Sequence, residues 1–329
     1  MPIQRAFLLA FILLLASAVS LGQQTAQPAP AKAGLPQNPS PMVEHARAHL
    51  RLPDRAPEGR REQLSLGKMF IPAKLKQKSK SAVPVLFMFH SPTFVPEIAA
   101  EKNGMVSVTI TIGAGSSAYA KPFMDHALFG KLLHEAEQEA GVRLRPITLA
   151  GWSAGCGAIR EIMSTPEYYD KIANTIMIDG IHTDYVNGTP GPLESEIDPG
   201  PLQIYVKLVK DAMAGKRRVL ITHTEIFPGT FASTTETADY ILHQVGLHAT
   251  PVVKWGPMGT QELSQTRSGK FLMVGFAGNS APDHVDQLHS LPEFVRWLKG
   301  LQGSGDRAVG PLKDNLHPLR RRHGRRALL

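Results

Sequence analysis

The feature that most constrains this chain is the alternation of short apolar runs with longer segments of helical pattern. The runs are rich in β-branched residues, as strands buried on both faces require. They predict strands at 83–90, 106–112, 147–150, 175–178, 218–222 and 270–276, with one or two antiparallel edge strands within 63–72. Helical patterns cover 128–140, 158–164, 202–214, 234–245 and 292–298. This order predicts a single α/β domain with a mostly parallel, doubly wound sheet and helices on both faces.

The amino-terminal end has the composition of an export signal. Arg5 precedes an unbroken apolar run at 6–15, and small residues follow up to Gly22. This pattern predicts a signal peptide over residues 1–22, cleaved after Gly22 or Ala18. An uncleaved membrane anchor is the alternative, but the apolar stretch is short for a span of about 20 residues. We therefore expect a secreted or periplasmic protein, with a bacterial envelope as one location and no stable membrane insertion after cleavage.

The remaining composition separates a folded middle from polar ends. Residues 23–41 are rich in Gln, Ala and Pro and predict a flexible linker. The folded domain is expected at 42–303, followed by a basic disordered tail at 304–329. Most of the formal charge of +8 comes from this tail, so a nucleic-acid groove in the fold is not indicated. The single cysteine, Cys156, excludes an internal disulfide and a cysteine-based zinc cluster.

A G-x-S-x-G motif lies between an expected strand and an expected helix. The sequence Gly151-Trp152-Ser153-Ala154-Gly155 follows strand 147–150 directly. A nucleophilic serine in such a turn has strained backbone angles, so its neighbours two residues away must be small. The turn raises Oγ above the sheet, and the Ala154 amide could bind an oxyanion. The alternative is a glycine-rich turn that only caps a helix.

With this motif in this position, the chain resembles the α/β-hydrolase superfamily, in particular its serine esterases and lipases. The resemblance covers most of residues 62–300 in the order of the elements, and the G-x-S-x-G turn is its specific motif. It implies a nucleophile, an acid and a histidine in that chain order. Ser153 would be the nucleophile, and the acid and histidine would lie downstream of it.

The resemblance places the histidine in the loop after the last strand. That loop is expected at 277–285 and contains His284, whereas the alternative, His289, is expected inside the following helix. The acid would follow one of two strands. Asp179 comes directly after strand 175–178, the position that pancreatic-type lipases use, and is the preferred candidate. Glu225, one strand later, is the alternative, and Asp179 could instead be an ordinary turn residue before glycine.

The loop after strand 83–90 should supply the second oxyanion donor. Many lipases and esterases have His-Gly there, but this chain has His-Ser-Pro-Thr-Phe at 90–94. Pro92 has no N–H to donate. Ser91 or Thr93 is therefore the expected donor, and Thr93 is preferred.

The resemblance implies a serine hydrolase that cleaves carboxylic esters of small molecules, with no metal or cofactor. Trp152, Phe94 and Phe231 are expected to contact the substrate, in a pocket shaped by loops 113–123 and 227–235. The segment 187–201, rich in Gly and Pro, is expected to form a short lid. The alternatives are a non-catalytic binding protein, a peptidase or an acyltransferase of the same fold. No feature of the sequence indicates the oligomeric state.

Overall fold

The computed structural model describes residues 48–75, 82–188 and 196–302. The predicted signal peptide (1–22), linker (23–41) and basic tail (304–329) lie outside the described residues, as does the middle of the expected lid. In the described part of the chain, no helix combines the length and apolar character needed to cross a membrane.

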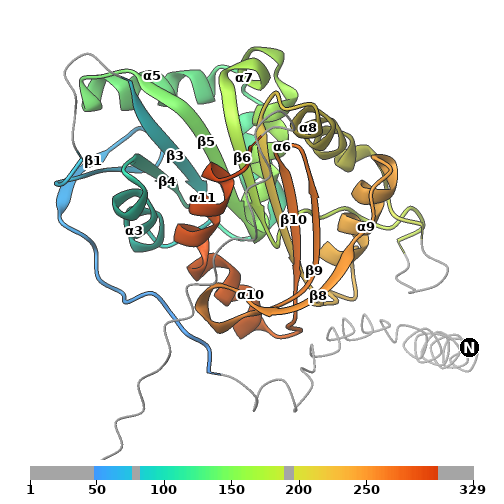
Figure 1. The fold of residues 1–329 in the computed structure, drawn as a ribbon. Helices are drawn as coiled ribbons and strands as arrows, with labels where there is room; N and C mark the ends of the chain where they lie inside the picture. The colour runs from blue at the N-terminus through green and yellow to red at the C-terminus, as the bar shows by residue number, and fades with distance from the viewer. Residues whose placement is uncertain (1–47, 76–81, 189–195, 303–329) are drawn as a thin grey trace, which may run out of the picture.

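A ten-stranded sheet forms the centre of the molecule, in the order β1-β2-β4-β3-β5-β6-β7-β10-β9-β8 (Figure 1). The six central strands, β4, β3, β5, β6, β7 and β10, are parallel to one another. At the two edges the pairing is antiparallel, between β4 and β2, β2 and β1, β10 and β9, and β9 and β8. The strands are β1 Gly59–Gln63, β2 Lys68–Pro72, β3 Val83–Phe89, β4 Val106–Ile110, β5 Leu144–Trp152, β6 Ile172–Ile178, β7 Arg218–Thr224, β8 Thr250–Trp255, β9 Gln261–Ser268 and β10 Phe271–Phe276.

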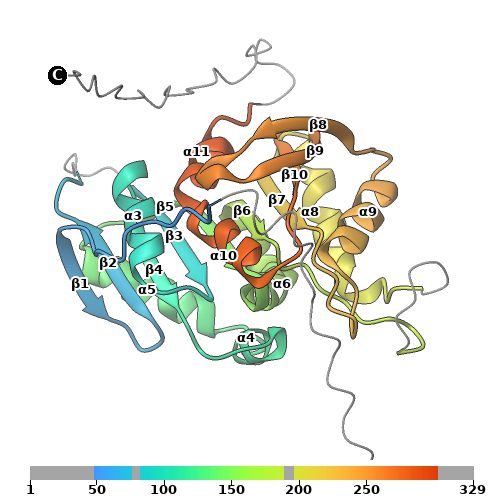
Figure 2. The same ribbon diagram turned by 90° about the horizontal axis from the view of Figure 1, so that it is seen from below.

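Helices cover both faces of this sheet (Figure 2), which confirms the predicted fold class. One face carries α3, α10 and α11, and the other carries α4 to α9. The α-helices are α3 Phe94–Asn103, α4 Ser116–Phe123, α5 Leu128–Ala140, α6 Cys156–Ser164, α7 Pro166–Lys171, α8 Gln203–Met213, α9 Thr234–Gln244, α10 Ala281–His289 and α11 Leu291–Lys299, with short 3-10 turns η1 Ser153–Gly155, η2 Gly200–Leu202 and η3 Pro257–Gly259.

Strand β3 is apolar along its length because both of its faces are buried. Phe87 and Phe89 face the core beneath α4 to α9, whereas Leu86 and Met88 face the core beneath α3 and α11. Successive side chains of a strand point to opposite faces, so a strand covered on both sides must be apolar at every position. The ring of Phe87 packs edge-to-face on Phe129 of α5, with 5.1 Å between ring centroids.

Several elements differ from the sequence-based expectation. Segment 113–123 was expected as a loop, but most of it is helix α4. Its Tyr119 is fully buried, with its hydroxyl donating to the Gly113 carbonyl at 3.0 Å, so packing stabilises a helix there despite Pro122. Strands β8 and β9 were not expected, because β9 is almost wholly polar and β8 has only two β-branched apolar residues in a row, next to a proline. The carboxyl ends of β3, β5, β6 and β7 meet at one edge of the sheet, where parallel sheets form their ligand sites.

Candidate active site

Ser153 lies at the tight turn between β5 and α6. Its φ is +50°, a left-handed conformation that is rare for a residue other than glycine. The two glycines of the motif lie where a side chain would not fit. A Cβ on Gly155 would overlap the carbonyl oxygen of Phe89 on β3, and one on Gly151 would lie 2.7 Å from the Gly155 carbonyl carbon. This close packing fixes the backbone around Ser153.

Asp179 follows β6 in a second left-handed turn, with φ +43°. The next residue, Gly180, packs directly on the backbone of Ser153. A Cβ on Gly180 would overlap the Ser153 carbonyl oxygen and lie 2.6 Å from the Ser153 nitrogen. The turn that carries the carboxylate and the turn that carries the serine are therefore in backbone contact.

The Asp179 carboxylate is buried and accepts hydrogen bonds from three residues. Thr224 at the end of β7 donates from its backbone N–H (2.9 Å) and its hydroxyl (2.8 Å). Thr234, the first residue of α9, donates its hydroxyl at 2.6 Å, and His284 Nδ1 lies 2.6 Å from Asp179 Oδ2. Burial raises the pKa of Asp179, but these partners favour the charged form and hold its pKa below the usual range. Asp179 is thus an ionised acceptor for the imidazole.

His284 is held from several sides. It lies in the first turn of α10 rather than in the expected loop, because Ser280 and Asp283 form a capping box that starts the helix earlier. The indole N–H of Trp152 donates to the His284 carbonyl at 3.0 Å, and the two rings lie 4.6 Å apart. On its other side, Trp152 stacks on His90 at 5.0 Å. Trp152 therefore supports His284.

A cavity of about 180 Å³ opens between these elements. Phe231 is among its lining residues, whereas Trp152, Phe94 and Thr93 are not. Ser153 Oγ makes no hydrogen bond with His284 within the described part of the chain; in enzymes without substrate this bond is often long and tightens on binding. The cavity is lined by Ser153, Asp179, His182, Ile226, Pro228, Phe231, Thr234, Ala281 and His284.

The two expected oxyanion donors lie in different elements. Ala154 is buried in the turn η1, directly after Ser153. Thr93 is the N-cap residue of α3, so its carbonyl accepts the first helical bonds. The loop before it is fixed by the Ser91 hydroxyl, which donates to the Pro92 carbonyl at 2.8 Å. Which N–H joins Ala154 stays a prediction.

The alternative acid and base lie elsewhere. Glu225 is exposed, and its backbone N–H donates to the Gly278 carbonyl at 3.0 Å. His289 Nδ1 accepts the Leu52 N–H at 3.0 Å, so it ties the amino-terminal segment to α10. Among the candidates, Asp179 and His284 are the pair that bond to each other and line a cavity with Ser153.

Nothing in the sequence indicated that residues 49–52 contact α10. Arg51 contacts the buried carboxylate of Asp286, and His49 Nδ1 lies 2.8 Å from Asp286 Oδ2. His49, Asp283 and Asp286 also form a group with metal-ligand chemistry. The Arg51 cation already balances Asp286, and Asp283 accepts the capping hydrogen bonds of α10, so this group fits a structural role.

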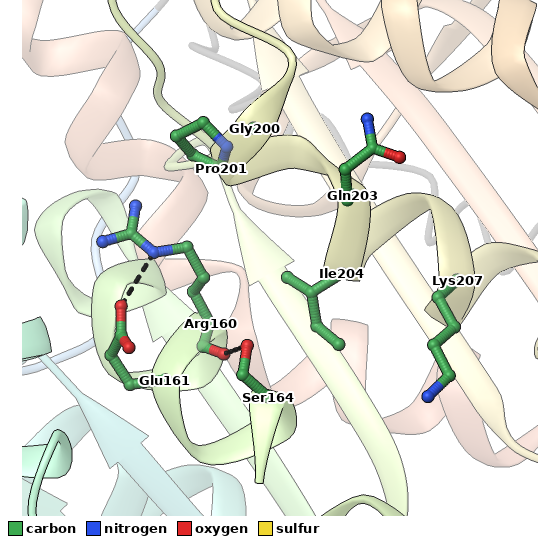
Figure 3. A pocket seen from close by; sticks show the side chains of 8 residues that line it. All are labelled: Arg160, Glu161, Ser164, Gly200, Pro201, Gln203, Ile204 and Lys207. Carbon is green, nitrogen blue, oxygen red and sulfur yellow. Dashed lines mark hydrogen bonds and ion pairs between the residues drawn. The ribbon is translucent and has the colours of Figure 1, made fainter. Parts of the chain in front are cut away.

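A second hollow, of about 470 Å³, lies between α6 and α8 (Figure 3). Arg160 Nε bonds to Glu161 at 3.0 Å and the Ser164 hydroxyl donates to the Arg160 carbonyl, whereas Lys207 lies over the ring of Tyr169. It contains none of the residues around Ser153. Its lining residues are Arg160, Glu161, Ser164, Gly200, Pro201, Gln203, Ile204 and Lys207.

Solved structures with a similar arrangement of elements include esterases, a lipase and peptidases. An ester hydrolase from the metagenome of Lake Arreo is 13% identical, with a TM-score of 0.48, covering 88% of this chain and 97% of that one. Carboxyl esterase 2 from Tuber melanosporum is 12% identical (TM-score 0.45), with the same coverage of both chains. A monoglyceride lipase from Saccharomyces cerevisiae is 12% identical (TM-score 0.41), covering 77% and 98%. No family model and no curated protein matches the chain.

The packing of the elbow generates a stability prediction. Gly155→Ala is expected to lower the free energy of unfolding by about 1–3 kcal/mol, because the added methyl overlaps the backbone of β3. Urea denaturation would measure it. Gly113→Ala is the matched control: the nearest atom to its Cβ is 3.8 Å away, so a change within about 0.5 kcal/mol is expected. Equal effects of the two changes would contradict the steric explanation.

The environment of Asp179 generates a pH prediction. Its pKa is lower in the folded chain than in the unfolded chain, so its charged form stabilises the fold above the unfolded pKa. That stabilisation is lost as the pH falls through the folded pKa. Between about pH 5 and about pH 3, the unfolding free energy of the wild type should therefore fall more steeply than that of Asp179→Asn. Parallel curves in urea titrations would show that the carboxylate is not stabilised as described.

Proposed function

We propose that this protein is an exported serine hydrolase that cleaves carboxylic esters of small molecules. The observation that carries the proposal is the 2.6 Å bond between His284 Nδ1 and the buried Asp179 carboxylate, in the same cavity as the strained Ser153. A histidine whose Nδ1–H is held by a carboxylate presents Nε2 as a base. The signal pattern at residues 1–22 supports export.

In the proposed reaction, Ser153 Oγ attacks the ester carbonyl carbon while His284 Nε2 takes the serine proton. The Ala154 N–H and an N–H of the 91–93 loop stabilise the oxyanion of the tetrahedral intermediate. His284 then gives its proton to the departing alkoxide, which leaves as an alcohol. Water, deprotonated by His284, then attacks the acyl-enzyme. As the second tetrahedral intermediate collapses, His284 returns the proton to Ser153 Oγ and the acid is released. Asp179 stays ionised throughout and stabilises the imidazolium.

The cavity supports a small substrate group. Its volume of about 180 Å³ is below the range of about 300–1,000 Å³ typical of pockets for drug-sized ligands. Amide cleavage and acyl transfer would use the same residues. Esters are favoured because an ester carbonyl is less stabilised by resonance than an amide carbonyl, and an alkoxide is a better leaving group than an amide anion.

Labelling with a fluorophosphonate probe tests the nucleophile. The wild type should gain one adduct by intact mass, because the probe reacts with an activated serine, and Ser153→Ala should gain none. Ser164→Ala is the matched control. Ser164 is an exposed serine at the end of α6, the helix that follows Ser153, so its replacement should not alter labelling. A folded wild-type protein that takes no label and cleaves no ester would support a binding protein instead.

Turnover of a short-chain nitrophenyl ester tests the acid. Asp179→Asn should lower kcat by about 10³- to 10⁴-fold, because the imidazole loses the acceptor that fixes its tautomer. Glu225→Gln, an exposed carboxylate one strand away, should change kcat less than about twofold. The reverse pattern would assign the acid to Glu225.

A further inference from the structure

His182 is a cavity residue that the proposed reaction does not use. It lies three residues after Asp179 and lines the same cavity as Ser153 and His284. Its ring meets Phe231 edge-to-face, with 5.0 Å between centroids and 79° between planes. This contact restricts the orientation of the imidazole.

The two ring nitrogens of His182 differ in their surroundings. Nδ1 is buried and has no hydrogen-bond partner among the described residues. Nε2 is not one of these buried atoms without a partner, so it is the ring nitrogen that can reach the cavity. An orphaned buried N–H is rarer than an under-satisfied acceptor, so the proton belongs on Nε2. Burial lowers the pKa of His182 to about 4, so this nitrogen is a neutral donor at neutral pH.

The other polar groups of the cavity are already engaged. The Thr234 hydroxyl donates to Asp179, whose carboxylate also accepts from His284. The remaining lining residues offer no side-chain donor; they are Ile226, Pro228, Phe231 and Ala281. His182 Nε2–H is therefore the one donor without a protein acceptor among the described side chains around this cavity, apart from the reacting Ser153 and His284.

We propose that His182 determines substrate specificity by donating from Nε2–H to an oxygen of the group that fills the cavity. The preferred substrate is then an ester with an ether, hydroxyl or carbonyl oxygen close to the scissile bond, in a short acyl or alcohol part. The proposal rests on the proposed ester hydrolysis. It also explains why an ester with a purely alkyl group of the same size would be a poorer substrate. Such a group would leave Nε2–H without a hydrogen-bond acceptor.

Matched pairs of esters that differ by one atom test this. On the acyl side, 4-nitrophenyl methoxyacetate is compared with 4-nitrophenyl butyrate; on the alcohol side, 2-methoxyethyl acetate is compared with butyl acetate. The readout is the ratio of kcat/KM for the ether to kcat/KM for the alkyl ester. In His182→Leu, this ratio should fall by about 2- to 10-fold for one pair, the fold-change that a neutral hydrogen bond gives. The intrinsic reactivity of each ester cancels when the two proteins are compared, and the pair that responds identifies the side.

Control variants separate recognition from folding. His134→Leu, on the exposed face of α5, should keep the wild-type ratio. His182→Gln carries an amide N–H near the place of Nε2, whereas the amide of His182→Asn falls closer to that of Nδ1. The ratio should therefore be higher in the Gln variant than in the Asn variant, and this comparison decides the matter if His182→Leu does not fold.

Two failures are distinguishable. Ester turnover with ratios that are the same in the wild type, His182→Leu, His182→Gln and His182→Asn would overturn the role of His182 alone. A folded wild type that cleaves none of the four esters and takes no fluorophosphonate would overturn the proposed function as well.

Discussion

The buried Asp179 carboxylate is the interaction on which the arrangement of the site depends. A charge in the core is tolerated only when hydrogen bonds and a counter-charge replace water. Here the partners come from three separate elements: Thr224 ends β7, Thr234 begins α9, and His284 lies in α10. Satisfying one carboxylate therefore fixes the relative positions of a strand, a helix start and the imidazole beside Ser153.

Backbone strain is concentrated at the same edge of the sheet. Outside glycine, a positive φ occurs at His90, Ser153 and Asp179, at the ends of the adjacent strands β3, β5 and β6, and at one further described residue in η3. Such conformations persist only where the surroundings determine them more strongly than local preference does. The contacts of Gly155 with β3 and of Gly180 with Ser153 provide that determination. The glycines are thus as necessary to the site as the polar side chains.

The sequence predicted those parts of the fold that local pattern controls. The buried strands and the helices α5, α6, α8 and α9 could be located because their apolar runs and periodicities are strong. Ser153 and Asp179 could be proposed because each follows such a strand. Strands β8 and β9 and helix α4 were missed because partner strands and a buried Tyr119, rather than local propensity, stabilise them. His182 carried no motif; its position after β6 was the one available signal.

The placement of His284 shows how a local signal and distant contacts combine. The capping box of Ser280 and Asp283 sets where α10 begins, and so sets the residue that faces the sheet edge. The direction of the helix depends on chain that is remote in sequence, because Arg51 and His49 contact Asp286 and the Leu52 N–H reaches His289. Trp152, beside the serine, then holds the His284 backbone. An imidazole supported by these contacts has little freedom to move. In the proposed reaction, the adjustment that brings Ser153 Oγ into hydrogen-bond contact with His284 therefore falls to the serine rotamer and to the substrate.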